Sequence, residues 1–165
     1  MTDLPAALGA GPYRIGLVCL GNICRSPMAD VVLTELVDRA GLTDEVVVDS
    51  CGTGGWHVGQ PMDRRAAATL LAADYDPSSH RAQQLDPDWF AHDVLLAMDA
   101  DNLADVQAMA PPSYGDRVRL FRDFDPVGTG DVPDPYYGGP DGFDEVLAMV
   151  ERTGIAIVAT LERRS

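Results

Sequence analysis

The sequence predicts a single α/β domain, with a four-stranded parallel sheet and helices on both of its faces. Short apolar runs alternate with longer segments in which apolar residues recur at helical spacing, and this pattern favours strands joined by helices. A chain of 165 residues with 46% hydrophobic residues is long enough for one substantial core and too short for two comfortable domains. We assign residues 13–165 to this domain and residues 1–12 to a flexible N-terminal extension.

The first strand and helix lie on either side of a short polar loop. Residues 13–19 form an apolar run that predicts a buried strand. Ser26 can serve as the N-cap of the following helix, and Pro27 suits the first helical turn. Apolar residues then recur every three or four positions until Gly41, which is a plausible helix stop.

The middle of the chain continues the alternation. Residues 46–50 predict a second short strand, which is followed by a glycine-rich loop. Pro61 begins an alanine-rich helix that is expected to end near Ala73. Residues 94–98 form a third apolar run and predict a third strand.

The last part of the chain supplies one more strand and two helices. Asp99 or Asp101 can cap a helix that ends at two consecutive prolines. Residues 118–121 predict the fourth strand, and residues 122–139 form a long loop rich in Asp, Pro and Gly. The final helix is expected over residues 141–163. Ligands of such sheets bind beyond the carboxyl ends of the strands.

Composition excludes several classes of function. The net charge is −14, and all twelve basic residues are arginines. Schiff-base catalysis and a Walker-type nucleotide site both need a lysine amine, so both are excluded. The acidic balance argues against nucleic acid as a partner. Neither a membrane span nor a signal peptide is recognisable, so we expect a cytoplasmic protein; the lack of lysine suggests a GC-rich bacterial genome.

The three cysteines, Cys19, Cys24 and Cys51, do not make the disulfide framework of a secreted protein. The sequence has no Cys-x-x-Cys pair and no histidine pair nearby, which makes a zinc site improbable. We expect no metal and no other cofactor.

The loop that starts at Cys19 carries the chemistry. A loop between a strand and a helix N-terminus presents free backbone N–H groups and the helix dipole to an anion. A cysteine thiol has a pKa of about 8.5 and needs such stabilisation to act as a thiolate. Arg25 would hold two phosphoryl oxygens, Ser26 can add a hydroxyl, Gly21 lets the backbone approach, and Asn22 tolerates unusual dihedrals. The loop predicts a thiolate that attacks phosphorus in a bound oxyanion.

Two stretches resemble one protein family. The sequence CLGNICRSP, from Cys19 to Pro27, resembles the signature loop of the low-molecular-weight protein tyrosine phosphatases. DPYYG, from Asp134 to Gly138, resembles a second motif of that family and lies over a hundred residues later. Weaker matches are Asp49-Ser50, Trp56, His80-Arg81-Ala82 and Met98-Asp99. The resemblance spans nearly the whole chain and implies a Rossmann-like fold of the phosphotyrosine phosphatase I type.

The resemblance implies hydrolysis of phosphotyrosine in proteins through a phosphocysteine intermediate. Cys19 would be the nucleophile, Arg25 would bind the phosphoryl group, and Asp134 would act as general acid and then as general base. His80, together with Asn22 and Ser26, would hold the loop and the thiolate. Further residues would bind the substrate: Leu20, Gly21, Asn22, Ile23, Cys24, Ser26, Trp56, Tyr136 and Tyr137. The expected partners are a phosphotyrosine protein and inorganic phosphate, as product and inhibitor, with a monomeric enzyme and no nucleic acid or membrane.

Some assignments stay open at this point. Trp56, with Tyr136 and Tyr137, would wall an aromatic slot for the substrate ring, but an ordinary role in loop packing explains Trp56 almost as well. Cys24 lies five positions after Cys19 in a curled loop, so a reversible disulfide between them is as plausible as simple packing. His57 and His92 carry little signal.

Three competing functions can be weighed from the sequence. An arsenate reductase of this architecture needs two further cysteines close together, and Cys51 stands alone. An arginine phosphatase of the related subgroup has threonine where this chain has Ile23. A module that only binds phosphate needs neither a thiolate nor an acid, so the set of Cys19, Arg25 and Asp134 argues against it.

Overall fold

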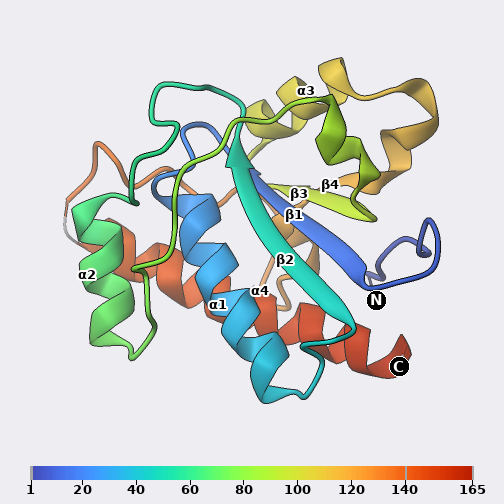
Figure 1. Ribbon diagram of the computed structural model, residues 1–165. Helices are drawn as coiled ribbons and strands as arrows, with labels where there is room; N and C mark the ends of the chain where they lie inside the picture. The colour runs from blue at the N-terminus through green and yellow to red at the C-terminus, as the bar shows by residue number, and fades with distance from the viewer. Residues whose placement is uncertain (1, 140, 165) are drawn as a thin grey trace.

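The computed structural model describes residues 2–139 and 141–164 and confirms the predicted α/β fold (Figure 1). Its four parallel strands form one sheet in the order β2-β1-β3-β4. The central strand β1 pairs Tyr13 with Val46 of β2 and Ile15 with Val94 of β3. The strand that ends at Cys19 is therefore held on both edges. The bounds of the strands are Tyr13–Cys19 (β1), Val46–Gly52 (β2), Val94–Ala97 (β3) and Val118–Leu120 (β4).

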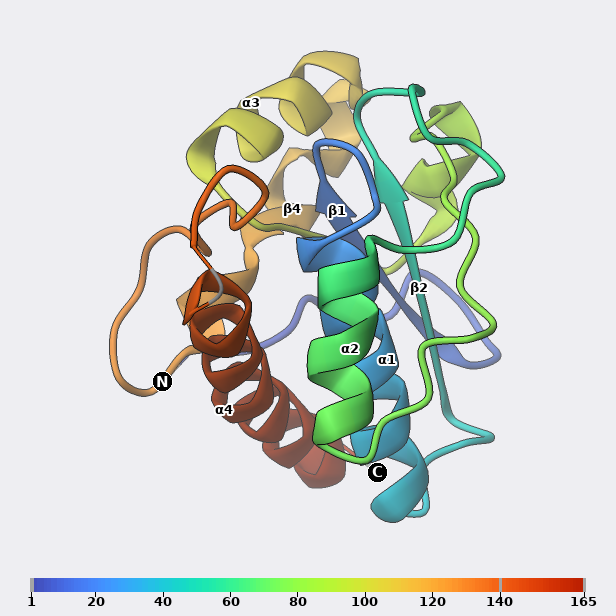
Figure 2. The same ribbon diagram turned by 90° about the vertical axis from the view of Figure 1, so that its left-hand side faces the viewer.

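Helices cover both faces of the sheet, as predicted. Helices α1 and α4 pack together against one face with α2 beside them, while α3 lies on the other face (Figures 1 and 2). Side chains of β1 alternate between the two cores: Ile15 and Leu17 pack on the α1 side, and Val18 packs with Leu95 and Val106 on the α3 side. The bounds of the helices are Arg25–Arg39 (α1), Arg64–Ala72 (α2), Ala100–Met109 (α3) and Asp141–Arg164 (α4).

The start of α1 differs from the prediction. The helix begins at Arg25, and Cys24 is its N-cap residue without any side-chain capping bond. Ser26 was predicted as the N-cap, and this was wrong because Ser26 lies inside the first turn and its hydroxyl turns toward the loop between β1 and α1. The first turn of α1 is therefore left open toward the loop, where its N–H groups can serve a ligand.

Aspartates fix the starts of the next two α-helices. Helix α2 begins at Arg64 and not at Pro61, because the Asp63 carboxylate accepts a hydrogen bond from the Arg65 N–H at 2.8 Å. The Asp99 carboxylate caps α3, as predicted, by accepting from the Asn102 N–H at 2.7 Å. In both cases the cap residue lies next to the site described below.

Three short 3₁₀ helices were not predicted from the sequence. They are η1 (Pro87–Ala91), η2 (Pro112–Arg117) and η3 (Phe121–Phe124). Two of them begin at a proline, whose fixed φ suits a tight helical turn, but segments this short have no apolar periodicity to reveal them. Helix η3 occupies the start of the predicted loop 122–139.

The N-terminal segment packs on the domain. Leu4 is 5% exposed, and the carbonyl of Pro5 accepts a hydrogen bond from the Tyr13 hydroxyl at 2.8 Å. The Arg164 guanidinium at the end of α4 donates to the carbonyls of Leu4 and Pro5 at 3.0 and 3.2 Å. The N-terminal segment therefore contacts both the start of β1 and the end of α4. The flexibility expected of residues 1–12 stays a prediction.

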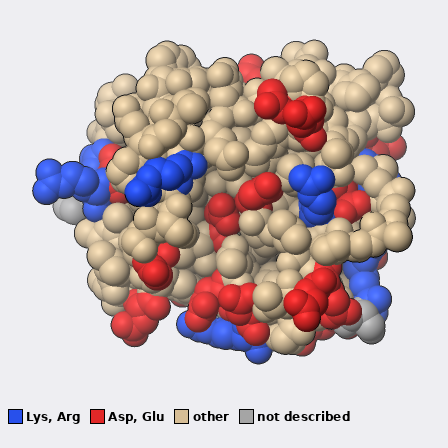
Figure 3. All heavy atoms as spheres, viewed as in Figure 1, with Lys and Arg blue, Asp and Glu red and all other residues tan. Residues whose placement is uncertain are grey.

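The surface is acidic. On the face seen in Figure 3, arginine side chains are scattered among aspartates and glutamates and form no continuous basic stripe. Among residues 2–139 and 141–164, no helix is long and apolar enough to cross a membrane. Within the same residues, no group of three or more His, Cys, Asp or Glu side chains is arranged to hold a metal ion. An anionic ligand must therefore be attracted by a local site rather than by the overall field.

Candidate active site

The loop between β1 and α1 forms a cradle for an anion. Asn22 has a φ of 57°, the left-handed conformation that asparagine tolerates and that curls the loop. The backbone N–H groups of residues 20–24 make no hydrogen bond within the described part of the chain. Unpaired N–H groups next to the N-terminus of α1 are the features that favour a bound oxyanion.

The thiol of Cys19 lies at the base of this cradle and is tied to a polar network. Its Sγ is 2.9 Å from the hydroxyl oxygen of Ser26. The Asn22 side-chain amide donates to the hydroxyls of both Ser26 and Ser50, at 2.8 and 3.0 Å. Asn22 donates to the Ser26 oxygen, so the Ser26 hydroxyl can direct its proton to the Cys19 sulfur or to the carbonyl of Cys51, which lies at 3.4 Å. The network fixes the position of the Cys19 sulfur beneath the loop.

Two contacts from residues 80–83 hold Asn22 in its unusual conformation. His80 donates from Nε2 to the carbonyl of Asn22 at 2.8 Å, and the Gln83 N–H donates to the Asn22 side-chain oxygen at 2.9 Å. Burial lowers the pKa of His80, and the bond to Asn22 only partly opposes this. A neutral His80 protonated on Nε2 satisfies the bond. The structure thus places His80 against the backbone of the loop, and its expected role in holding the thiolate stays a prediction.

Arg25 is buried at 2% exposure beside the thiol, and three oxygens orient its guanidinium. One terminal nitrogen donates to Asp99 at 2.6 Å and to the carbonyl of Val132 at 3.0 Å, and the other lies 3.6 Å from the Asp134 carboxylate. Burial opposes the charge of Arg25, but Asp99 and the other nearby acidic groups outweigh it and raise its pKa. The guanidinium is a permanent cation with a fixed direction.

Asp134 reaches the same place from the long loop before α4. Its carboxylate accepts from the Tyr136 N–H at 3.1 Å, and its side chain is 40% exposed. A cavity of about 290 Å³ opens between this loop and the cradle. The fold thus brings the three predicted catalytic residues to one cavity, whose walls are Cys19, Leu20, Gly21, Ile23, Cys24, Arg25, Trp56, His57, Asp134, Tyr136 and Tyr137.

The predicted substrate-binding residues divide into two groups. Those of the cradle and the three aromatic residues line the cavity, with Trp56, Tyr136 and Tyr137 exposed at 69%, 39% and 93% around its mouth. Asn22 and Ser26 do not line it: both are 0% exposed and lie beneath the loop, where they support it.

Two residues at the site were missed as site residues from the sequence. His57 lines the cavity and lies beside Gly21, although its sequence context carried no signal. Asp99 was predicted only as a helix cap and as part of a weak motif match, yet its carboxylate forms a 2.6 Å ion pair with Arg25. The position of Asp99 directly after β3 is a usable signal, since ligands collect at the carboxyl ends of parallel strands.

The second thiol of the loop is buried and free. Cys24 is 5% exposed, and burial together with the negative charges of Asp63, Cys19 and Asp134 raises its pKa to about 12. Cys51 is free and fully buried as well. Cys19 and Cys24 are not joined in this structure, so their disulfide under oxidation stays a prediction.

Comparisons with known proteins agree on one family. A family model described as low molecular weight phosphotyrosine protein phosphatase matches residues 14–165. A low molecular weight protein-tyrosine-phosphatase of Streptomyces coelicolor is 45% identical over 92% of this chain and 95% of the relative. A protein tyrosine phosphatase of Entamoeba histolytica superimposes with a TM-score of 0.88 at 33% identity, covering 92% of this chain and 98% of that one.

The fold is also shared beyond tyrosine phosphatases. A structure described as YwlE arginine phosphatase superimposes with a TM-score of 0.83 at 25% identity, covering 92% of this chain and 97% of that one. Fold alone therefore leaves the substrate open. The match over nearly the whole chain and the geometry of the Cys19 loop together show that this protein belongs to the low molecular weight phosphotyrosine protein phosphatases, a family of cysteine-dependent phosphatases.

Proposed function

We propose that this protein hydrolyses phosphotyrosine in proteins through a phosphocysteine intermediate, with Cys19 as nucleophile, Arg25 as phosphate clamp and Asp134 as general acid and base. One observation carries the proposal: a thiol, a buried guanidinium and a carboxyl from distant parts of the chain meet in one cavity of about 290 Å³. A site for binding alone needs only the cradle and the guanidinium. The thiol and the carboxyl add the two groups that bond making and bond breaking require.

In the first step, the Cys19 thiolate attacks phosphorus while the bond from phosphorus to the phenolic oxygen breaks. The electron pair of that bond leaves with the oxygen, and the Asp134 carboxyl donates its proton to it. Arg25 and the N–H groups of residues 20–24 bind the three equatorial oxygens and stabilise their charge. Asp134 lies 3.6 Å from Arg25 in the free protein. A phosphoryl group bound by Arg25 would replace this contact and leave the Asp134 carboxyl free to meet the departing oxygen.

In the second step, a water molecule attacks phosphorus and the bond from sulfur to phosphorus breaks. The carboxylate of Asp134, which has lost its proton to the phenol, accepts a proton from this water. The thiolate is released as the leaving group, and the donated hydrogen bond from Ser26 at 2.9 Å stabilises it. The products are a tyrosine side chain and inorganic phosphate, and the enzyme returns to its initial state.

The walls of the cavity support an aromatic substrate. Trp56, Tyr136 and Tyr137 surround the mouth, and Ile23 adds an aliphatic side chain inside it. These residues suit a flat apolar ring, and a phenolate leaves more easily than an alkoxide. Ile23 in place of threonine favours a tyrosine ring over a guanidinium, which argues against the arginine phosphatase activity that the fold alone would permit.

Arsenate reduction is the alternative that needs further cysteines to exchange disulfides with Cys19. Cys51 is 0% exposed, and burial raises the pKa of its thiol, so it is poorly placed to accept a disulfide from Cys19. We further propose a monomeric cytoplasmic enzyme that inorganic phosphate inhibits by occupying the cradle.

The test measures hydrolysis of a tyrosine-phosphorylated peptide, with an arginine-phosphorylated peptide and arsenate as competing substrates. The wild type, Cys19→Ser and Asp134→Ala are compared. We expect hydrolysis of phosphotyrosine alone, loss of activity beyond 10³-fold in Cys19→Ser, and a loss of about 10²-fold or more in Asp134→Ala. Cys51→Ser serves as the matched control for removing a thiol, and it should keep the activity.

The intermediate can be observed directly. Rapid acid quenching of the wild type during turnover should trap phosphate on Cys19, detected by mass spectrometry of the loop peptide. Activity that survives in Cys19→Ser would refute the mechanism. Preference for the arginine-phosphorylated peptide would leave the mechanism intact and refute the substrate class.

A further inference from the structure

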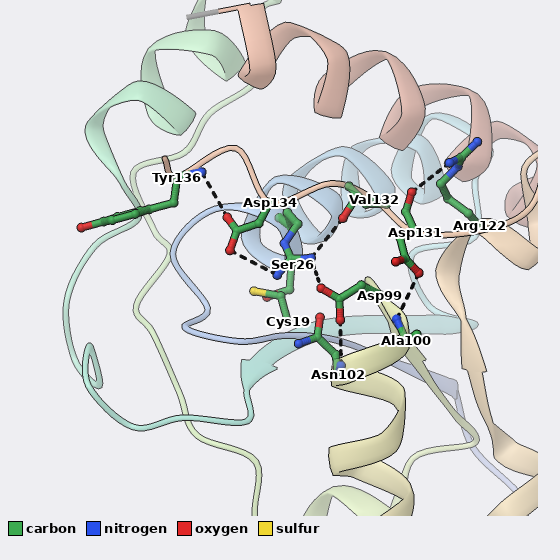
Figure 4. A network of polar contacts seen from close by, with 11 residues as sticks. Cys19, Ser26, Asp99, Ala100, Asn102, Arg122, Asp131, Val132, Asp134 and Tyr136 are labelled. Atoms are coloured by element: carbon green, nitrogen blue, oxygen red, sulfur yellow. Dashed lines mark hydrogen bonds and ion pairs between the residues drawn. The ribbon is translucent and has the colours of Figure 1, made fainter. Parts of the chain in front are cut away.

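The position of the Asp134 carboxylate depends on the turn that follows it. Asp134 is 40% exposed, and one of its oxygens accepts from the Tyr136 N–H at 3.1 Å (Figure 4). The other oxygen lies 3.6 Å from Arg25, a contact that an arriving phosphoryl group would replace. During a reaction the hydrogen bond from the Tyr136 N–H therefore remains, and the position of this backbone sets the position of the Asp134 carboxylate.

Arg65 of α2 holds that backbone from the opposite side. Its guanidinium donates to the carbonyl of Tyr136 at 3.1 Å. The same group lies over the ring of Tyr136 at 5.3 Å and over the ring of Phe143, a buried residue of α4, at 4.8 Å. Arg65 therefore restrains the turn in two ways, through the backbone of Tyr136 by the hydrogen bond and through the aromatic rings by cation–π contacts.

Asp63 in turn holds Arg65 and connects it to the nucleophile loop. Its two carboxylate oxygens accept from Nε and a terminal nitrogen of Arg65, at 3.1 and 3.0 Å. Such a two-point contact fixes the plane of the guanidinium. The backbone N–H of Asp63 donates to the carbonyl of Ile23 at 2.8 Å, inside the cradle. Ile23, Asp63, Arg65 and Tyr136 thus form a continuous chain of contacts from the anion cradle to the turn of the acid.

We propose that Arg65 is a positioning residue for the reaction, which sets the distance between Asp134 and the phosphoryl group held by the cradle. The inference rests on the proposed function. The Arg65 side chain is 47% exposed, and ion pairs this open contribute little to folding stability, so the value of the contact lies in placing the acid. Without Arg65 the turn can move away from the cradle while Cys19 and Arg25 stay in place.

The experiment compares kcat/KM for two substrates of different leaving-group ability. Tyrosine phosphate needs a proton from Asp134 to release its phenol, whereas dinitrophenyl phosphate releases an anion that is stable without one. Arg65→Met removes the donor and the charge but keeps an unbranched side chain of similar reach. We expect kcat/KM to fall about tenfold with tyrosine phosphate and to stay within about twofold with dinitrophenyl phosphate, because only the first reaction draws on general acid catalysis.

Matched variants isolate the cause. Arg64→Met removes the same charge from the adjacent, exposed position of α2 and should behave as the wild type with both substrates. Asp63→Asn keeps a side chain that can cap α2 but weakens the grip on Arg65, and should reproduce a smaller form of the same substrate split. In an Asp134→Ala background, Arg65→Met should cause no further loss, since there is no acid left to position.

Three results would overturn the inference. An equal loss with both substrates would indicate damage to the cradle, a rise in KM shared by both would assign Arg65 to substrate binding, and behaviour equal to Arg64→Met would deny it any role. The proposed function fails in a different way: Cys19→Ser would then keep activity, or Asp134→Ala would hydrolyse the two substrates with the wild-type ratio.

Discussion

The contact between the end of β2 and the nucleophile loop allows a sharp test of how much space the cradle needs. Gly52 lies opposite Cys19 in the parallel ladder. A methyl group added at Gly52 would stand 2.7 Å from the carbonyl oxygen of Leu20 and 3.0 Å from the amide nitrogen of Asn22. Both are backbone atoms of the cradle, which cannot rotate away as a side chain can. We predict that Gly52→Ala distorts the cradle while the fold survives.

The size of the effect follows from the geometry. The 2.7 Å contact is about 0.7 Å shorter than the 3.4 Å at which ordinary non-bonded contacts begin, so the loop must shift by about that much. A misplacement of about 1 Å can cost about 100-fold in rate, so a shift of this size should lower kcat/KM by about 20-fold. Overpacking of this kind costs about 1–3 kcal/mol, which should appear as a lower free energy of unfolding.

The assay combines steady-state hydrolysis of an aryl phosphate, inhibition by inorganic phosphate and unfolding in urea. Gly115→Ala is the control, because a methyl group there meets no heavy atom within 4 Å. Gly52→Ala should weaken both kcat/KM and phosphate inhibition, and Gly115→Ala should change neither. A Gly52→Ala protein that is less stable but has unchanged kcat/KM would show that β2 and not the cradle gives way, and would refute the reasoning.

Two further predictions concern buried charges. Burial alone would raise the pKa of Asp125, but ion pairs with Arg152 and Arg122 outweigh it and lower the pKa to about 2. The stabilisation is complete above the unfolded-state pKa of about 4 and is lost as the pH falls toward 2, so the wild type should lose about 2 kcal/mol across this interval while Asp125→Asn shows no such loss in urea titrations at each pH. Asp99→Asn keeps a residue that can cap α3 but removes the nearest counterion of Arg25. The substitution should lower the free energy of unfolding by about 3 kcal/mol, and added phosphate should stabilise the variant more than the wild type. Equal stability of the two proteins in phosphate-free buffer would contradict this.

The nucleophile loop could be predicted because its parts are consecutive in the chain. Cys19 and Arg25 are separated by a strand-to-helix turn, whose geometry follows from local rules. Asp134 was predicted through its motif and not through any physical rule that places it near the thiol. Contacts between side chains from distant elements, such as Asp99 with Arg25 or Arg65 with Tyr136, depend on how helices dock, and no local pattern encodes them.

Element boundaries show the same limit on a smaller scale. Serine is a favoured N-cap residue, yet the hydroxyl of Ser26 is hydrogen-bonded to the thiol of Cys19 and the side-chain amide of Asn22 instead of capping the helix. Pro61 is a good first residue for a helix, but the carboxylate of Asp63 offers a capping bond two residues later. In both cases helix propensity alone makes several start positions nearly equal, and the hydrogen bonds that nearby side chains form decide where the helix begins.

The separation of the two halves of the site along the chain has a consequence for folding. The cradle is built from β1, the start of α1 and the end of β2, whereas the acid arrives only when the loop before α4 docks. Pairing of near elements closes shorter loops and costs less chain entropy than docking of the far ones. The backbone of the cradle can therefore assemble first, but Arg25 receives its orienting contacts from Asp99 and Val132 only when later elements dock. Phosphate binding and release of the phenol thus both report on completion of the whole domain.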